Sequence, residues 1–158
     1  NEPVINLSET QRAVNEDFTQ DILITVALSR PSLTAITLPI IVDGDASTED
    51  FILETTSVTV PAGALSADMI VRVINDTEIE PSELLGLSLG APLPVNSATL
   101  GSNTRFELQI NDNDAATLAF SSSAIAQVTE GNTLVNIAVE LSTTSFEPIT
   151  VVLSRFNI

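Results

Sequence analysis

The chain has 158 residues, 44% of them hydrophobic, which is enough for one ordinary domain with a packed core. Its 21 acidic residues face five Arg and no His, and the resulting net charge of −16 makes nucleic acid and anionic membranes poor partners. Because His and Cys are absent, the usual general base, thiol nucleophile and zinc ligands are missing, and we do not expect an enzyme.

No apolar run reaches the ~18 residues that a membrane-spanning helix needs, so we expect no direct membrane insertion of this fragment. The first residues, NEPVINLSET, lack the basic and apolar regions of a signal peptide. We therefore expect an excised fragment whose targeting information lies outside it.

Apolar residues alternate with polar ones in six segments, a pattern typical of strands with one buried face. The segments are 22–28, 36–42, 58–60, 69–73, 85–89 and 106–110, and none has a sustained helical period. Short strands separated by turn signals predict an all-β fold. We expect an antiparallel two-sheet β-sandwich, immunoglobulin-like, with about seven strands.

The chain contains an internal repeat. Residues 13–29 can be laid over residues 127–142, and VINL at 4–7 matches TLAF at 117–120, which gives a period of about 113 residues. We predict one full sandwich repeat at 1–114 and the N-terminal part of a second, incomplete repeat at 115–158. The fragment would then come from a tandem array.

Residues 115–158 are too few to close a sandwich alone. Val135, Ile137, Val139 and Leu141 would expose an apolar face that needs a partner. The candidates are the first domain, another chain in a homodimer, and a strand swap through residues 115–158.

Acidic residues gather in four places: Glu16 with Asp17, residues 43–50, residues 76–83, and Asp112 with Asp114. A sandwich can bring several of these loops to one end, where like charges would repel one another. Ca²⁺ accepts six to eight oxygen ligands in loose geometry, whereas Mg²⁺ prefers few carboxylates and zinc prefers His or Cys. The composition therefore favours a calcium site.

Several motifs stand in the order found in Calx-beta domains: Glu16, DGDASTEDF, VPAG, VINDTEIEPSE and INDND. Residues 1–114 resemble this family nearly end to end, and the pattern then restarts. Calx-beta domains are sandwich repeats of sodium–calcium exchanger regulatory loops, of one integrin β-subunit and of large bacterial surface proteins. The resemblance implies a calcium-binding sandwich.

The resemblance also implies a set of calcium ligands, with Glu78 contributing its backbone carbonyl: Glu16, Asp50, Asn75, Asp76, Glu78, Glu80, Glu83, Asp112, Asn113 and Asp114. Asn75 and Asn113 stand where tightly binding members often have Asp. Lower ligand charge implies fewer ions or an affinity near ~10⁻⁴ to 10⁻³ M. In the second repeat Glu130 alone matches.

Some of these features have simpler interpretations. The acidic loops are also consistent with solvation of a protein from a salty habitat. Asp43 and Asp45 in DGD are interpreted first as turn residues around Gly44, and they are left out of the site. Arg72 and Arg105 alternate with buried residues, so we expect them on the outer sheet faces as partners for acids.

The leading functional hypothesis is a calcium-binding structural or adhesion module of a large extracellular or cell-surface protein, from a bacterium. Ca²⁺ would rigidify the end loops and the junction between repeats at 114–116. The alternative is a regulatory calcium sensor of a membrane transporter. A glycosidase built on a carboxylate pair is a third possibility, but it would need more aromatic residues than the chain offers.

Overall fold

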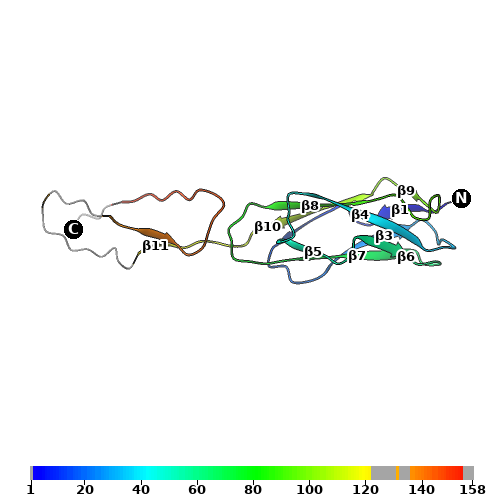
Figure 1. The fold of residues 1–158 in the computed structure, drawn as a ribbon, viewed down its shortest axis with the longest axis horizontal. Coiled ribbons are helices and arrows are strands. Elements are labelled where there is room, and N and C mark those ends of the chain that lie inside the picture. Colours follow the sequence, from blue (N-terminus) through cyan, green and yellow to red (C-terminus); the bar gives the residue numbers. More distant parts are fainter. Residues whose placement is uncertain (1, 122–130, 132–135, 155–158) are drawn as a thin grey trace. The chain divides into compact units, whose positions relative to one another are not determined.

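All regular secondary structure is β-strand within residues 2–121, 131 and 136–154, which are the residues that the computed structural model describes (Figure 1). No helix in those residues is long and apolar enough to cross a membrane. The strands are β1 (Val4–Leu7), β2 (Gln11–Asn15), β3 (Ile22–Leu28), β4 (Ile36–Gly44), β5 (Phe51–Leu53), β6 (Ser57–Val60), β7 (Ser66–Val73), β8 (Glu83–Leu89), β9 (Thr99–Leu100), β10 (Arg105–Asn111), β11 (Leu118–Phe120) and β12 (Val139–Leu141).

The chain divides into two compact units. The first contains residues 1–76 and 82–112, and the second contains residues 77–81 and 113–158. In the first unit, one sheet has the strand order β5-β7-β3-β1-β9 and the other β2-β10-β8-β4-β6. This architecture confirms the predicted all-β sandwich of two sheets.

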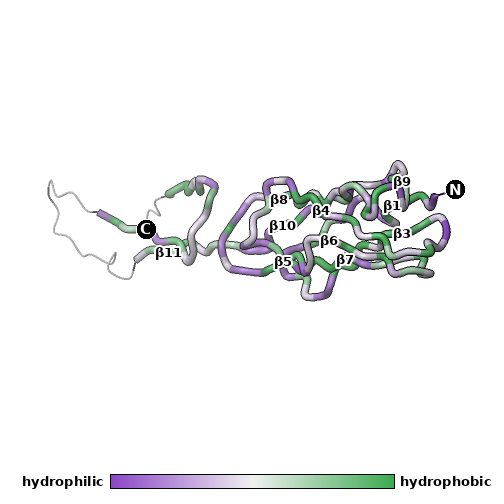
Figure 2. The backbone as a smooth tube through the Cα atoms, turned by 45° about the vertical axis from the view of Figure 1, so that its right-hand side comes forward, coloured by the Kyte–Doolittle hydropathy of each residue, from purple (hydrophilic) through white to green (hydrophobic). Residues whose placement is uncertain are grey.

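The core lies between these two sheets. Its fully buried side chains alternate along the strands, as the sequence pattern predicts, and include Ile22, Ile24, Leu38, Leu87 and Phe106. Hydrophobic stretches accordingly follow the strands in Figure 2, while hydrophilic stretches mark the loops beside β5, β8 and β10. Each of the six predicted segments falls within a strand.

Val42 corrects one detail of the predicted pattern. The alternation from Ile36 predicts a buried Val42, but this side chain is 45% exposed. Pairing of β4 with β6 ends at Pro39, and beyond it β4 continues beside β8 up to Gly44, with exposed side chains after Ile40. The end of β4 beyond Ile40 therefore contributes no buried side chain to the core.

The first two strands of this unit, β1 and β2, are parallel neighbours of its last two, β9 and β10. Val4 and Ile5 pair with Thr99 and Leu100, and Gln11–Asn15 pairs with Glu107–Asn111. Between these pairs both segments cross from one sheet to the other. The other strand pairs in the two sheets are antiparallel.

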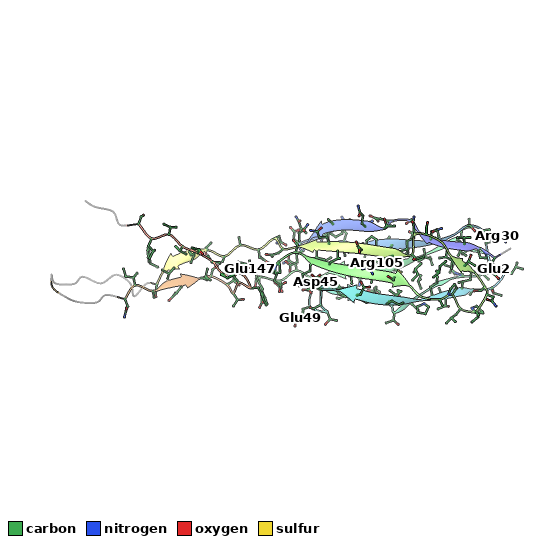
Figure 3. The ribbon with its side chains drawn as sticks, turned by 90° about the horizontal axis from the view of Figure 1, so that it is seen from above. Glu2, Arg30, Asp45, Glu49, Arg105 and Glu147 are labelled. Atoms are coloured by element: carbon green, nitrogen blue, oxygen red, sulfur yellow. The ribbon has the colours of Figure 1, made fainter. Side chains whose placement is uncertain are left out.

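These registers bring several loops to one end of the first unit. Strands β2 and β10 end there because they run parallel, and β8 begins there because it is antiparallel to β10. Strand β4 is antiparallel to β8 and therefore ends where β8 begins. The loop after β4 leads into β5, which begins at this end, and β7 ends there because it is antiparallel to β5. Figure 3 shows Asp45 and Glu49 at this end and Glu2 and Arg30 at the opposite end. We call the end with Asp45 and Glu49 the acidic end.

In the second unit, β11 and β12 form a two-stranded antiparallel sheet. Leu118 pairs with Leu141 and Phe120 with Val139, which reproduces the β1–β3 register with every partner displaced by 113 residues. The exposures differ, however. In the first unit, the inward side chains of β1 and β3 are at most 6% exposed: Ile5, Leu7, Val26 and Leu28. Their equivalents in the second unit are 40% to 63% exposed: Leu118, Phe120, Val139 and Leu141. Glu130 and Val135 lie outside the described residues.

Candidate metal centre

Glu16 is a buried carboxylate at the acidic end. It follows β2 directly, and its backbone N–H donates to the carbonyl of Asn111 at 2.9 Å, which extends the β2–β10 ladder by one bond. Its side chain is only 7% exposed. Oε1 accepts a hydrogen bond from the backbone N–H of Asp76 at 2.9 Å. A carboxylate this buried is costly unless hydrogen bonds or a cation compensate its charge.

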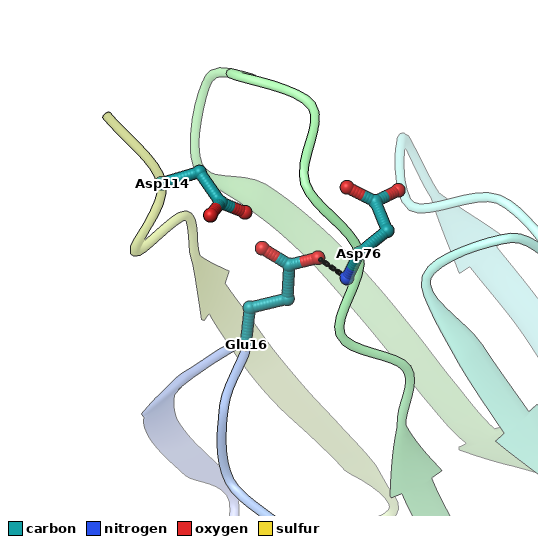
Figure 4. A group of neighbouring side chains, drawn as sticks. All are labelled: Glu16, Asp76 and Asp114. Atoms are coloured by element: carbon teal, nitrogen blue, oxygen red, sulfur yellow. Dashed lines mark hydrogen bonds between the residues drawn. The ribbon is translucent and has the colours of Figure 1, made fainter. Parts of the chain in front are cut away.

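Two further carboxylates lie close to Glu16. Glu16, Asp76 and Asp114 each offer a carboxylate oxygen, and these oxygens lie within 4.8 Å of one another. Figure 4 shows the three side chains and the bond from the Asp76 N–H to Glu16. Asp76 follows β7 and Asp114 follows β10, so residues far apart in sequence are brought together by strand register.

A second group of carboxylates consists of Asp50, Glu80 and Glu83, again with oxygens within 4.8 Å of one another. Asp50 is held in place on two sides. Its side chain accepts the N–H of Ser47, and its carbonyl accepts the N–H of Ile74 at 2.8 Å. Glu83 is the first residue of β8 and pairs with Ile110.

The remaining predicted ligands are not in either group. Asn75 is exposed, and its side-chain amide donates to the carbonyl of Asp76 at 3.1 Å. Glu78 and Asn113 are also exposed, and the Glu78 and Asp112 carboxylates belong to neither group. Both groups in the described part of the chain consist entirely of residues that the sequence predicts as ligands.

The neighbouring acids that were interpreted as turn residues have structural partners. Asp45 Oδ1 accepts the backbone N–H of Leu84 at 2.6 Å, which fixes the loop after β4. Both carboxylate oxygens of Asp43 accept from the Arg105 guanidinium at 2.7 Å. These hydrogen bonds lower the pKa of Asp43. Arg72 similarly pairs with Asp21 and Glu54, as expected for Arg on the outer sheet faces.

The donor set fits a calcium ion. Ca²⁺ binds oxygen at about 2.3–2.6 Å, so two ligands of one ion lie up to about 5 Å apart. Carboxylate oxygens within 4.8 Å of one another satisfy that limit. Without a cation, two unit charges 4 Å apart repel by about 4 kcal/mol at an effective dielectric constant of 20. The arrangement is therefore suited to a hard divalent cation.

Comparison with known proteins defines the class of fold. No family model matches the chain, and no curated protein sequence does. Among solved structures, the apo-form Calx CBD1 domain has a TM-score of 0.62 at 16% identity, with 72% of this chain and 100% of that chain covered. The first unit and this domain thus share a β-sandwich fold.

Two other similar structures are larger. The calcium binding domain CBD12 of CALX1.1 has a TM-score of 0.60 at 19% identity, over 70% of this chain and 44% of that one. A putative carbohydrate binding protein from Bacteroides ovatus has a TM-score of 0.55 at 12% identity, over 76% of this chain and 40% of that one. At these identities the likeness establishes the fold.

Proposed function

We propose that this chain belongs to the Calx-beta group and is a calcium-binding structural module. The observation that carries the proposal is the buried Glu16 carboxylate, held against the loop after β7 and grouped with further carboxylates at the acidic end. The calcium binding domain of CALX1.1, which has the same fold, supports the choice of ion. The ion would be held by Glu16, Asp76 and Asp114, with Asp50, Glu80 and Glu83 as a second set.

Calcium binding would stabilise the folded module by linkage. An ion that binds only the folded form adds RT ln(1 + [Ca²⁺]/Kd), or about 2.7 kcal/mol at 100 times Kd. In a domain of this size, 1 kcal/mol raises the melting temperature by roughly 4 °C. Binding would also order the loops at the acidic end and the junction that follows β10.

We place the module in a tandem array of a large extracellular or cell-surface protein, bacterial in origin. The tandem array is supported by the β11–β12 register, which repeats that of β1–β3 at a spacing of 113 residues. The exposed apolar residues of β11 and β12 correspond to core residues of the first unit. They are the start of a second sandwich, and a neighbouring repeat, a homodimer or a strand swap would cover them.

The alternative function is regulatory calcium sensing in a membrane transporter. The resemblance of the motifs to exchanger regulatory loops and the fold shared with the Calx domains favour it. The complete gene distinguishes the two proposals. Transmembrane segments flanking the module would favour the sensor, and repeats continuing in both directions would favour the structural array.

The test of calcium binding is thermal unfolding of the 158-residue chain in EGTA, in millimolar Ca²⁺ and in equal Mg²⁺. We expect a rise in melting temperature that is specific to Ca²⁺ and is reduced in Asp76→Asn. Glu2→Gln removes one exposed charge at the opposite end and is the matched control, so it should retain the full rise. If Ca²⁺ acts no more strongly than an equivalent ionic strength of NaCl, the module is a passive spacer with solvated acidic loops.

A further inference from the structure

The ends of the first unit are joined along an unbroken parallel path. Residues 4–15 and residues 99–111 run side by side, first in one sheet and then in the other. Hydrogen bonds also span the crossing: Leu7 N–H donates to Asn103 carbonyl at 2.7 Å, and Asn103 N–H donates to the Asn6 side chain at 3.0 Å. The two segments therefore stay paired where they change sheets.

The direction of these strands determines how they respond to tension. The N-terminus lies at one end of the first unit, and after β10 the chain leaves this unit at the opposite, acidic end (Figure 1). Pulling on the two ends draws residues 4–15 one way and residues 99–111 the other, along the strand axes. Because the segments are parallel neighbours, the backbone bonds between them are loaded together in shear rather than one after another.

We propose that the first unit bears mechanical tension along the chain, with residues 4–15 and 99–111 as its clamp. A backbone hydrogen bond lies at each end of the clamp. Thr99 N–H donates to the Pro3 carbonyl at 3.0 Å, and Glu16 N–H donates to the Asn111 carbonyl at 2.9 Å. Sliding the strands would also pull the buried side chains of Ile5, Leu7 and Val14 out of the core. The clamp requires no bound ion, so it is distinct from the proposed calcium binding.

The test compares two pulling directions by single-molecule force spectroscopy in EGTA. Because the chain has no Cys, introduced thiols provide unique handles. Handles at Glu2→Cys and Ala115→Cys load the clamp in shear. Handles at the exposed Ser8→Cys and Ser102→Cys pull its strands apart sideways, so that the bonds break in succession. We expect a several-fold higher unfolding force in shear at the same loading rate. Equal forces in the two directions would overturn the proposal.

A pair of adjacent substitutions tests the clamp bonds themselves. Two bonds fix which backbone groups of β2 face β10: Thr10 carbonyl accepts from the Glu107 N–H, and Glu16 N–H donates to the Asn111 carbonyl. Along a strand, successive N–H groups point to opposite sides. The Arg12 N–H therefore points toward β10, and the Ala13 N–H points away from it. Arg12→Pro should lower the shear force toward the sideways value, whereas Ala13→Pro, on the solvent side of this edge strand, should not. An unchanged force in folded Arg12→Pro would contradict the proposal, and if that variant does not fold, the comparison of directions decides.

Discussion

Oε1 of Glu16 accepts the backbone N–H of Asp76 at 2.9 Å, which joins the end of β2 to the loop after β7 across 60 residues of sequence. One buried carboxylate thus has two roles: it holds a loop through a hydrogen bond and contributes charge to the candidate metal centre. The two roles are separable because an amide can replace the first but not the second.

Replacement of Glu16 should distinguish these roles in EGTA. Glu16→Gln keeps a side-chain oxygen for the Asp76 N–H and removes a charge that repels its neighbours, so the free energy of unfolding should be unchanged or higher. Glu16→Ala leaves that donor without this acceptor and should lose about 1–3 kcal/mol. Urea unfolding measures both values. Equal losses in the two variants would mean that the hydrogen bond contributes nothing.

Truncation in the core should be costly only in the first unit. Phe106 is fully buried and pairs with Leu87, so Phe106→Ala should lower the free energy of unfolding by about 3–5 kcal/mol. Phe120 is 63% exposed in the second unit, and Phe120→Ala is the control. Urea unfolding of the main transition should show a loss for Phe106→Ala alone. A similar loss for Phe120→Ala would place that ring in a core.

Two glycines with positive φ should respond differently to Ala. Gly44 has φ +108°, and an added Cβ would overlap the backbone carbonyl of Leu84, which cannot move without disturbing β8. Gly63 has φ +79° with open space around it, so Gly63→Ala should cost only the backbone strain, about 1–2 kcal/mol. Gly44→Ala should cost clearly more, as measured by thermal unfolding. Equal effects would show that the loop after β4 adjusts freely.

The ion pair between Asp43 and Arg105 should make a contribution that depends on pH. Arg105 lowers the folded-state pKa of Asp43 below the ordinary 3.8, so the contribution is present above that value and is lost as pH falls through the lower folded pKa. Arg105→Gln should be slightly less stable than wild type at neutral pH, and the difference should shrink below about pH 4. Added salt should also reduce it, because the pair is exposed. Urea midpoints that diverge on acidification would contradict this assignment.

The sequence predicts the strands whose side chains alternate between core and solvent, such as Ile22–Leu28, because burial of one face imposes a period of two. It also predicts a strand before Glu16, which is β2, but without bounds. The local sequence QRAVN could not show that β2 pairs with β10, because that partner is 96 residues further along the chain. β5 and β9 have only three and two residues, too few to show a period.

The candidate site was predictable in its location but not in its internal grouping. Register in a sandwich places alternate loops at the same end, so the acids after β2, β7 and β10 were expected to meet. The separation of Glu16, Asp76 and Asp114 from Asp50, Glu80 and Glu83 depends on side-chain positions a few ångströms apart. No local pattern encodes such distances, and the resemblance supplied a combined set without dividing it.

The pairing of β2 with β10 also has a consequence for synthesis of the protein. In its sheet β2 has β10 as its neighbour, so it stays unpaired until the ribosome has released Asn111. At 5–20 residues per second that delay is roughly 5–20 s for a unit of this length. A chain interrupted before β10 leaves β2 unpaired and one edge of β8 bare, and exposed strand edges promote aggregation. The last strand of the first unit to be made, β10, is therefore the one that completes its sandwich and protects the nascent chain.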